Sequence, residues 1–499
     1  MIADDTKALC LEDVEFITSE IKRLSDLSVH GKSFKEIYGE GHSGVIEFSA
    51  VVRDESTGLE LRCGRKARNR FRAIASRLIH PLDDARAWNP DALDDYLHST
   101  FLGFMLDESY SHEADRVSAW VEDAIRQVRF QNREAVHYIP CVALGLGDRQ
   151  TYRFGPITFV KKALFLKENS QAIEFYETAR DRLSERARRN ASPSQQHCWQ
   201  ASDDSKKIGV LDAFNRFADG MGWIAAVPVG RCDHSLSEER AEIALRICLA
   251  SMKLLVEGKE GADLRASDDP SQPKAKHRLS NIGRRKFRTT GNIQFGLPTV
   301  PADWDTQILL DAGPIVAVCS LLIQQALDGV RRPFAFEIAL RSLTWYADAI
   351  SDLNDETQLI KCVTAIESLV LPTDRAARAA VIIRGSLLAQ RPDWEAKRCA
   401  ALADELYAVR SNLAHGNVEL LSSRRPGLNR EALDFAKGVI CRFFSICSEL
   451  RPLGANVEGT KAELLHYYFR LYGRFSVQIE EIVTHYDLGK PWKKLQSQR

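Results

Sequence analysis

The feature of this sequence that most limits its fold lies after about residue 306, where amphipathic segments follow one another with no strand-like stretch between them. Apolar residues recur there with the period of a helix that buries one face. Proline or aspartate stands at several boundaries, where helices begin or end. Helices are therefore predicted at about 307–328, 334–351, 356–370, 374–390, 393–415, 429–450 and 460–486. Short connections between such helices predict an antiparallel bundle.

The first 305 residues mix strand-like and helix-like segments. The stretches 136–146 and 151–161 are rich in β-branched and aromatic residues, and Gly147-Asp148 lies between them. This pattern predicts a β-hairpin. Other segments are predicted as strands at 44–52 and 222–230, and as helices within 62–131 and at 237–258.

The predicted fold class is therefore α+β, with a small antiparallel sheet in the N-terminal region and an all-α C-terminal bundle. The expected division is a mixed α/β region at 1–305, a helical bundle at 306–490 and a basic tail at 491–499. Within the first region, residues 259–291 show almost no apolar periodicity. They are predicted as a long exposed, mobile loop.

Composition narrows the class of protein. The chain has 499 residues, of which 44% are hydrophobic, and its 68 Lys+Arg balance its 68 Asp+Glu. No overall charge favours nucleic acid or membrane, so a polyanion would have to meet local clusters. The 11 cysteines are dispersed without a CxxC pair, which favours reduced thiols and a cytoplasmic location. No signal peptide or membrane span is expected, because no basic stretch followed by an apolar run opens the chain.

Several familiar enzyme signatures are missing from the sequence. It contains no GxxxxGK[ST], GxGxxG, HExxH or GxSxG pattern, so phosphate-loop, dinucleotide, zincin and hydrolase-elbow chemistry is not indicated. The nearest approach to a metal site is Cys232-Asp233-His234, which lacks a second ligand pair. We therefore expect neither a metal nor a cofactor.

The segment RSNLAH at 410–415 is the main candidate for a site. Leu402, Leu406, Val409 and Leu413 form one apolar stripe of the predicted helix, and Arg410 and His415 both lie outside it. At about 100° per residue the two polar residues are separated by about 140°. One interpretation is that they are cations of the last turn, complementing the helix dipole before Gly416. The other is that arginine grips a phosphate and histidine exchanges a proton.

The sequence ELYAVRSNLAHG at 405–416 resembles the R-x4-6-H motif of the HEPN superfamily, in particular its ApeA-like branch. Two further stretches fit the branch's helix order: IKCVTAIESLVLP at 360–372 resembles its acidic helix, and RAARAAVIIRGSLLA at 375–389 its intervening helix. The resemblance covers about 334–450. It implies a metal-independent RNA endonuclease whose helical bundle forms a homodimer and brings two RxxxxH motifs together.

The resemblance also implies roles for individual residues. His415 would be the general acid/base and Arg410 the phosphate stabiliser, with Ser411 and Asn412 orienting them or the substrate. Glu367 would hold Arg410 or His415 through a hydrogen bond, or else be a solvated helix carboxylate. Ser411 departs from the Asn, Asp or His that directly follows the arginine in many active motifs. Tyr407 either stacks on a base or packs within the bundle.

Two basic stretches stand out against the balanced charge. Residues 62–72 carry six Arg/Lys, among them Arg65, Lys66 and Arg68, and residues 274–288 carry seven, among them Arg284, Arg285, Lys286 and Arg288. Each is predicted either to neutralise RNA phosphates or to form a solvated face.

By the same resemblance, the first 305 residues would be a sensor that restrains the nuclease until a phage-derived or small-molecule trigger appears, so the protein would act in antiphage defence. Two other interpretations stay open. One is a catalytically silent HEPN bundle used for dimerisation or nucleotide/RNA binding. The other is a structural regulator whose N-terminal region binds protein.

Overall fold

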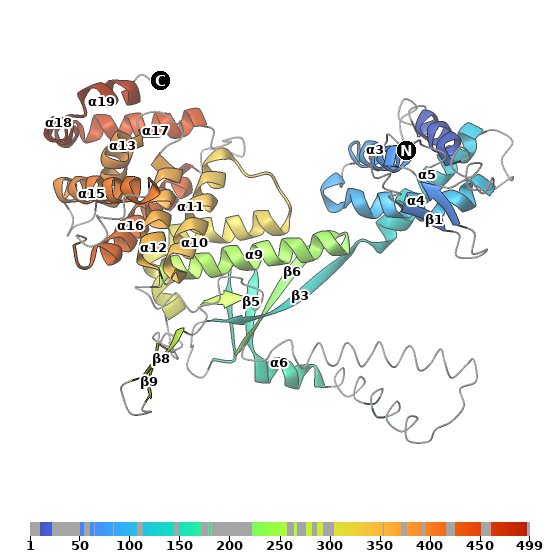
Figure 1. Cartoon of the computed structure of the whole chain (residues 1–499), viewed down its shortest axis with the longest axis horizontal. Coiled ribbons are helices and arrows are strands. Elements are labelled where there is room, and N and C mark those ends of the chain that lie inside the picture. The colour runs from blue at the N-terminus through green and yellow to red at the C-terminus, as the bar shows by residue number, and fades with distance from the viewer. Residues whose placement is uncertain are drawn as a thin grey trace. The chain divides into compact units, whose positions relative to one another are not determined.

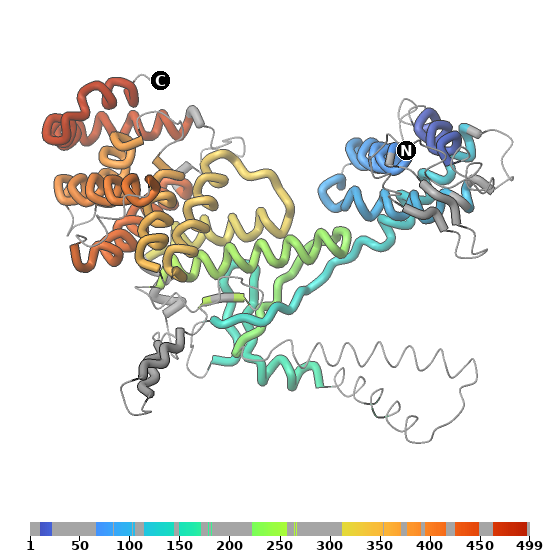
Figure 2. Tube along the Cα trace, in the orientation of Figure 1, coloured from blue at the N-terminus to red at the C-terminus, as the bar shows by residue number. Residues whose placement is uncertain are grey.

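The computed structural model shows a mostly helical chain with a small antiparallel sheet, and at this level the predicted fold class is confirmed (Figure 1). The structure describes residues 10–21, 50–53, 60–63, 65–82, 84–106, 113–143, 149–170, 178, 181, 222–256, 264–266, 276–281, 287–292, 304–352, 354–370, 377–390, 395–415, 425–450 and 461–496. The remaining residues are grey in the trace of Figure 2.

The chain divides into two compact units. The first combines Met1–Ala135 with Val229–Arg240, and the second combines Val136–Pro228 with Ala241–Arg499. The boundary predicted at residues 305/306 falls inside the second unit. The second unit therefore contains most of the five-stranded sheet as well as the helices that follow residue 306.

The first unit consists mainly of helices. They lie at 10–21 and at α3 (Arg65–Ile79), α4 (Pro90–Leu106) and α5 (Glu113–Gln131), as predicted for most of 62–131. Strands β1 (Ala50–Arg53) and β2 (Glu60–Cys63) pair antiparallel. The predicted strand at 44–52 overlaps β1, and its residues 44–49 lie outside the described part of the chain.

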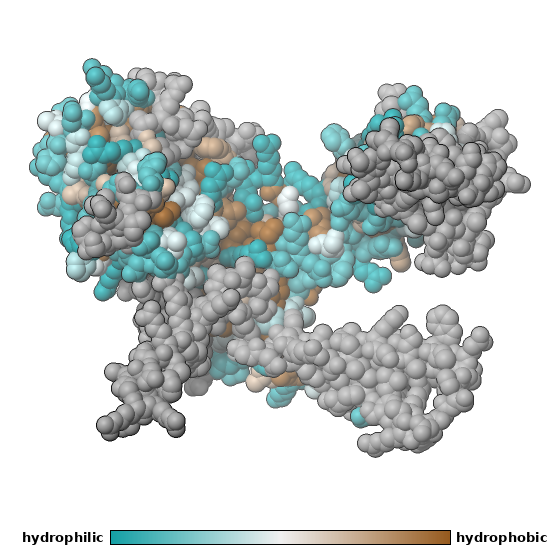
Figure 3. Space-filling model, in the orientation of Figure 1, coloured by the Kyte–Doolittle hydropathy of each residue, from teal (hydrophilic) through white to brown (hydrophobic). Residues whose placement is uncertain are grey.

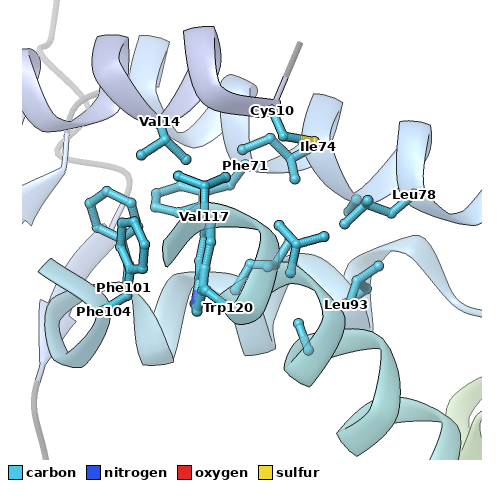
Figure 4. Close-up of a cluster of buried hydrophobic side chains, with 14 of the residues drawn as sticks. Cys10, Val14, Phe71, Ile74, Leu78, Leu93, Phe101, Phe104, Val117 and Trp120 are labelled. Carbon is cyan, nitrogen blue, oxygen red and sulfur yellow. The ribbon is translucent and has the colours of Figure 1, made fainter. Parts of the chain in front are cut away.

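Aromatic residues from three helices make the core of the first unit (Figure 4). Phe71 of α3 meets Phe101 of α4 edge to face with ring centroids 5.1 Å apart, and Phe104 stacks on Trp120 of α5 at 4.8 Å. The Trp120 indole N–H donates to Thr100 Oγ1 at 2.9 Å. Large buried rings of this kind contribute most of the burial energy in a small core.

The sheet has the strand order β4-β5-β6-β3-β7. Its strands are β3 (Arg133–Val142), β4 (Thr151–Phe154), β5 (Ile157–Lys161), β6 (Trp223–Cys232) and β7 (Arg265–Ala266). The pairs β4–β5, β5–β6 and β3–β7 are antiparallel. Strand β6 confirms the strand predicted at 222–230, and α9 (His234–Leu255) confirms the following helix within about three residues at either end.

The hairpin predicted between 136–146 and 151–161 is wrong. Strand β3 neighbours β6 and β7, whereas β4 pairs with β5 through a turn at Gly155-Pro156. Gly155 has φ +56°, a conformation that favours glycine, and a Cβ there would lie 3.2 Å from Oγ of Ser320 in α10 (Trp304–Leu327). The turn is therefore fixed by backbone conformation and by close packing, and Gly147-Asp148 lies outside the described residues.

The long loop predicted at 259–291 is also only partly correct. Besides β7, strands β8 (Lys276–Asn281) and β9 (Phe287–Asn292) pair antiparallel, with Lys276 opposite Asn292. Backbone pairing in a two-stranded ribbon needs no apolar periodicity, so the sequence pattern did not reveal it.

The helices after residue 306 follow the predicted order. They are α10, α11 (Phe334–Ser351), α12 (Asp355–Val370), α13 (Ala377–Ala380), α14 (Ser386–Ala389), α15 (Ala396–Ala414), α16 (Leu428–Leu450), α17 (Lys461–Arg474), α18 (Ser476–His485) and α19 (Gly489–Gln496). No strand occurs in the described residues after 306. Helix α16 packs against α10, α11, α12 and α14, and α12 also contacts α15.

Three details differ from the predicted helices. The segment 374–390 is interrupted by a π-helical turn at Val381–Gly385. The segment 460–486 is two helices, which meet at Phe475. Most of the predicted basic tail belongs to α19. This helix packs on the unit, since Leu495 at its end is fully buried and the Trp492 ring packs on Tyr472.

Candidate functional site

The RSNLAH segment lies at the C-terminal end of α15, where burial decreases along the helix. The last fully buried residue of α15 is Leu406, whereas Val409 and Leu413 of the predicted stripe are half-buried. The apolar face is therefore covered in the first part of the helix and only partly covered beside the motif. This leaves the motif near the surface of the second unit.

Arg410 is the motif residue with the firmest connection to the rest of the unit. Its Nη2 donates to Oε2 of Glu367 in α12 at 3.1 Å, and the two side chains are 31% and 14% exposed. Burial raises the pKa of the Glu367 carboxyl above its usual value, and the Arg410 guanidinium opposes that shift. Of the two predicted partners of Glu367, the described residues show Arg410 and not His415.

One donor of the Arg410 guanidinium is unused. Its Nε–H is buried and has no hydrogen-bond partner among the described residues. A buried donor without a partner costs about 1–3 kcal/mol, so an oxygen atom that reaches it would recover part of that cost. Because the guanidinium is planar, Glu367 fixes the direction in which Nε points. The guanidinium is thus held in one orientation, with its Nε–H unpaired among the described residues.

His415 directly follows α15 as its C-terminal cap, and its side chain is exposed. Its backbone N–H donates to the carbonyl of Ser411 at 3.1 Å. A protonated ring at this position would complement the helix dipole. The same exposed ring can meet a substrate, so the position fits both interpretations of the motif. Gly416, which the sequence places after the helix, lies outside the described residues.

Three further predicted site residues lie within the motif or one turn before it, and none of them takes part in the Arg410–Glu367 ion pair. Ser411, Asn412 and Tyr407 are all half-buried. Nε of Arg378 donates to Asp404 at 2.8 Å. The pKa of Arg378 is raised mainly by Asp404 and to a smaller extent by Tyr407. Tyr407 therefore lies close to a charged pair at the surface of the helices.

Three arginines of the first basic stretch, 62–72, contact carboxylates of their own unit. Arg68 of α3 contacts Asp94 and Asp95 of α4 at 2.8 Å each. Arg70 contacts Asp13 in the helix at 10–21 at 2.6 Å, and Arg77, further along α3, contacts the same carboxylate. Of the predicted RNA-binding residues here, Arg68 is thus committed to two carboxylates. Lys66 is exposed, and the side chain of Arg65 lies outside the described part.

The second basic stretch, 274–288, is described in part. Arg284, Arg285 and Lys286 lie outside the described residues, and Arg288 is a backbone member of β9. Their predicted contact with RNA stays a prediction.

The Cys232-Asp233-His234 cluster connects the last residue of β6 to the first residue of α9. Asp233 Oδ1 accepts hydrogen bonds from the Ser235 backbone N–H at 3.0 Å and the Ser235 hydroxyl at 2.7 Å. This is the geometry of a helix N-cap. The His234 ring lies 3.3 Å from Glu238 one turn on. Among the described residues, no group of three or more His, Cys, Asp and Glu side chains is arranged to hold a metal ion.

Sequence reasoning assigned no role to Arg384, which lies in the π-helical turn and is almost completely buried, at 1% exposure. Its Nε donates to Tyr472 Oη at 2.5 Å and its Nη1 to the Val370 carbonyl at 2.7 Å. Its guanidinium also lies over the ring of Tyr468, 4.7 Å from the centroid. The available signal was one arginine inside the apolar run AAVIIRGSLLA.

Comparison with known proteins adds no relative: no family model, curated protein or solved structure matches the chain. None of the described helices combines the length and apolar character needed to cross a membrane.

Proposed function

We propose that the protein is a metal-independent RNA endonuclease of the HEPN type, with Arg410 and His415 as its catalytic pair. The observation that carries the proposal is the state of Arg410, which is half-buried, oriented by Glu367 and left with an unpaired Nε–H, on the turn that ends at an exposed histidine. Most buried polar groups in folded proteins have a hydrogen-bond partner, and this donor lies inside the motif.

The proposed reaction uses the ribose 2′-OH of the RNA itself. His415 withdraws the hydroxyl proton, and the 2′ oxygen attacks the adjacent phosphorus, breaking its bond to the 5′ oxygen. Arg410 stabilises the added negative charge through its unused donor. The products carry a 2′,3′-cyclic phosphate and a 5′-OH that has gained a proton. DNA lacks the attacking hydroxyl and would not be cleaved.

A dimer would bring the two polar residues together. On one helix they diverge by about 140°, and Val409 and Leu413 leave a partly covered apolar surface beside the motif. We propose that the helices after residue 306 form a HEPN-like bundle, that a second copy packs on this surface, and that each cleft takes its arginine and histidine from two motifs. The cell would use this cytoplasmic nuclease against phage, with residues 1–305 responding to the trigger.

The test is RNA cleavage by the full chain in EDTA, with the new 3′ ends identified. We expect cyclic phosphate ends, and a loss of roughly 10²- to 10⁴-fold in His415→Ala, the usual size of a general acid/base contribution. Arg410→Ala should also lose activity. The matched controls are His466→Ala and Arg442→Ala, which change exposed residues of α17 and α16. Cutting that survives His415→Ala, or that leaves a 3′-OH, refutes the mechanism.

The dimer has its own test. Co-expression of His415→Ala with Arg410→Ala gives mixed dimers in which one cleft regains both residues if the cleft is shared. Partial recovery of cleavage supports the shared cleft, and no recovery rejects it.

The second candidate is a catalytically silent HEPN bundle that serves dimerisation or nucleotide/RNA binding. It is favoured by the structural roles already visible, since Arg410 pairs with Glu367 and His415 caps α15. RNA that stays intact with every phage-derived or small-molecule activator tried would select this candidate over the nuclease.

A further inference from the structure

The last three helices line an open cleft that no sequence motif indicated. The cleft between α17, α18 and α19 has a volume of about 650 Å³. Ligand pockets for small molecules span about 300–1,000 Å³, so the cleft has room for a compound of nucleotide size. The face of the helical region seen in Figure 3 is mostly hydrophilic with apolar patches. The residues that line the cleft likewise include both apolar and polar side chains.

One wall of the cleft is aromatic and rigid. Tyr472 lies edge to face with Trp492 of α19, with ring centroids 4.8 Å apart, and with Phe469, at 5.6 Å. Behind this wall, the buried Arg384 donates to the Tyr472 hydroxyl at 2.5 Å. Because Arg384 is itself held by the Val370 carbonyl, the orientation of the tyrosine is set before any ligand arrives.

Apart from Gly473 and the apolar Ile479, the remaining lining is polar and carries both signs of charge. Ser476 and Glu480 of α18 and Lys493 and Gln496 of α19 line the cleft. The exposed side of α19 is basic, with Lys490 and Lys494 close to Lys493 in sequence. Among the lining residues Lys493 is the one cation, and it suits a ligand that carries a phosphate.

We propose that this cleft binds a mononucleotide unit, either as a free nucleotide or as a nucleotide of a single-stranded RNA. The base stacks on the aromatic wall beside Trp492, and the phosphate pairs with Lys493. Glu480 accepts hydrogen bonds from the amino or hydroxyl groups of the base and ribose. Stacking on aromatic side chains together with a basic contact is the usual way in which proteins hold unpaired nucleotides.

The cleft is separate from the Arg410 motif. Lys397, near the start of α15, contacts Glu481 of α18 at 3.1 Å. Arg410 lies thirteen residues further along the same helix, a distance of roughly 20 Å. The proposal therefore concerns a second site of the same unit and does not rest on the nuclease activity.

Direct binding to the full chain tests the proposal. The four ribonucleoside 5′-monophosphates, their nucleosides and inorganic phosphate are titrated by calorimetry. We expect at least one monophosphate to bind, its nucleoside to bind several-fold more weakly, and phosphate alone not to bind. Trp492→Ala should weaken the monophosphate by about tenfold or more, as for the loss of one stacked base, whereas Trp492→Phe should retain most of the affinity.

Two lysines of α19 give a matched pair of variants. Lys493→Ala should reduce monophosphate affinity several-fold without changing nucleoside affinity, and Lys490→Ala, outside the cleft, should change neither. Thermal melting confirms that each variant is folded. Absence of binding for all four monophosphates refutes the proposal, as does binding unaffected by both Trp492→Ala and Lys493→Ala.

A competition experiment distinguishes the two sources of the ligand. A short single-stranded RNA that displaces the monophosphate, and that itself loses affinity in Trp492→Ala, identifies an RNA subsite. Failure of the RNA to displace it identifies a site for a free nucleotide.

Discussion

Two segments of this chain carry arginines in patterns that predict contact with RNA, and the structure uses them in different ways. In the basic stretch 62–72, Arg68 and Arg70 end on carboxylates that are 1% exposed, those of Asp94 and Asp13. In the RSNLAH segment, Arg410 has one carboxylate partner and an unpaired Nε–H. The first set of arginines holds helices together, whereas the second is restrained and still has a donor to offer.

The difference lies in the arginines' partners, and arginine density does not reveal it. The stretch with six Arg/Lys in eleven residues would rank first by charge alone. Yet the buried carboxylates opposite it need cations, since a buried charge without a partner is costly. Glu367, by contrast, is 14% exposed and so depends less on its arginine. A useful criterion for a phosphate-binding arginine is therefore how many of its donors the protein itself already uses.

The largest change in stability is expected when Asp13 is substituted, because its carboxylate accepts hydrogen bonds from both Arg70 and Arg77. Asp13→Asn should lower the free energy of unfolding of the first unit by about 2–3 kcal/mol. This is less than for a fully buried pair, because both arginines remain partly solvated. Chemical denaturation followed by tryptophan fluorescence measures it.

The control for Asp13 is Asp95→Asn, which removes a 73% exposed partner of Arg68 and should cost about 0.5 kcal/mol or less. Equal effects of the two substitutions would show that burial does not separate these ion pairs.

A smaller effect concerns pH. Burial raises the pKa of Asp94 to about 6 and lowers that of His98, one turn along α4, to about 4. Between about pH 4 and 6 the folded state holds the Asp94 proton that the unfolded state has lost, so this group's stabilisation falls as pH rises. His98 acts in the opposite direction, because the unfolded state binds the proton that the folded state excludes. The two contributions nearly cancel in the natural sequence.

Single substitutions should separate these two contributions. In Asp94→Asn, the stability of the first unit should rise by about 2 kcal/mol between pH 4 and 6, and in His98→Gln it should fall by a similar amount. Urea midpoints across this pH range provide the measurement. Parallel pH profiles for the two variants would contradict the assignment.

Local patterns predicted the helices well, since the segments at 334–351 and 356–370 match α11 and α12 to within one residue. Their apolar period and boundary residues act within one element, where sequence suffices. The β3 pairing failed for the opposite reason. Its neighbour β6 lies about eighty residues away in the sequence, and no local signal selects a partner at that distance.

In the candidate site, too, local features could be predicted from the sequence and contacts between distant residues could not. The position of His415 at a helix end follows from its neighbours, but the contact of Arg410 with Glu367 joins residues 43 apart. The contact was suggested by the resemblance to the helix order of the HEPN superfamily. The spacing of the two residues in the sequence did not predict it. The cleft at Trp492 was inaccessible to prediction, because a segment taken as one helix is two and the supposed tail is the third wall.

The smallest predicted effect tests whether the Arg410 contact really differs from those of the basic stretch. The pKa of Glu367 stays raised despite Arg410, so at neutral pH the ionised carboxylate is less favourable in the folded than in the unfolded state. Glutamine removes that charge and keeps an oxygen for Arg410. Glu367→Gln should therefore raise stability by up to about 1 kcal/mol at pH 7–8, and this gain should disappear as pH falls below the usual glutamate pKa.

The same substitution at Glu405, whose carboxylate contacts Arg425 at 3.1 Å on the surface, is the matched control and should change stability by about 0.5 kcal/mol or less. Denaturation midpoints at pH 4 and pH 8 decide the outcome. If Glu367→Gln instead loses 1 kcal/mol or more at pH 8, the pair stabilises the fold as Asp13 does. The end of α15 would then resemble the basic stretch, and the unpaired Nε–H alone would distinguish Arg410.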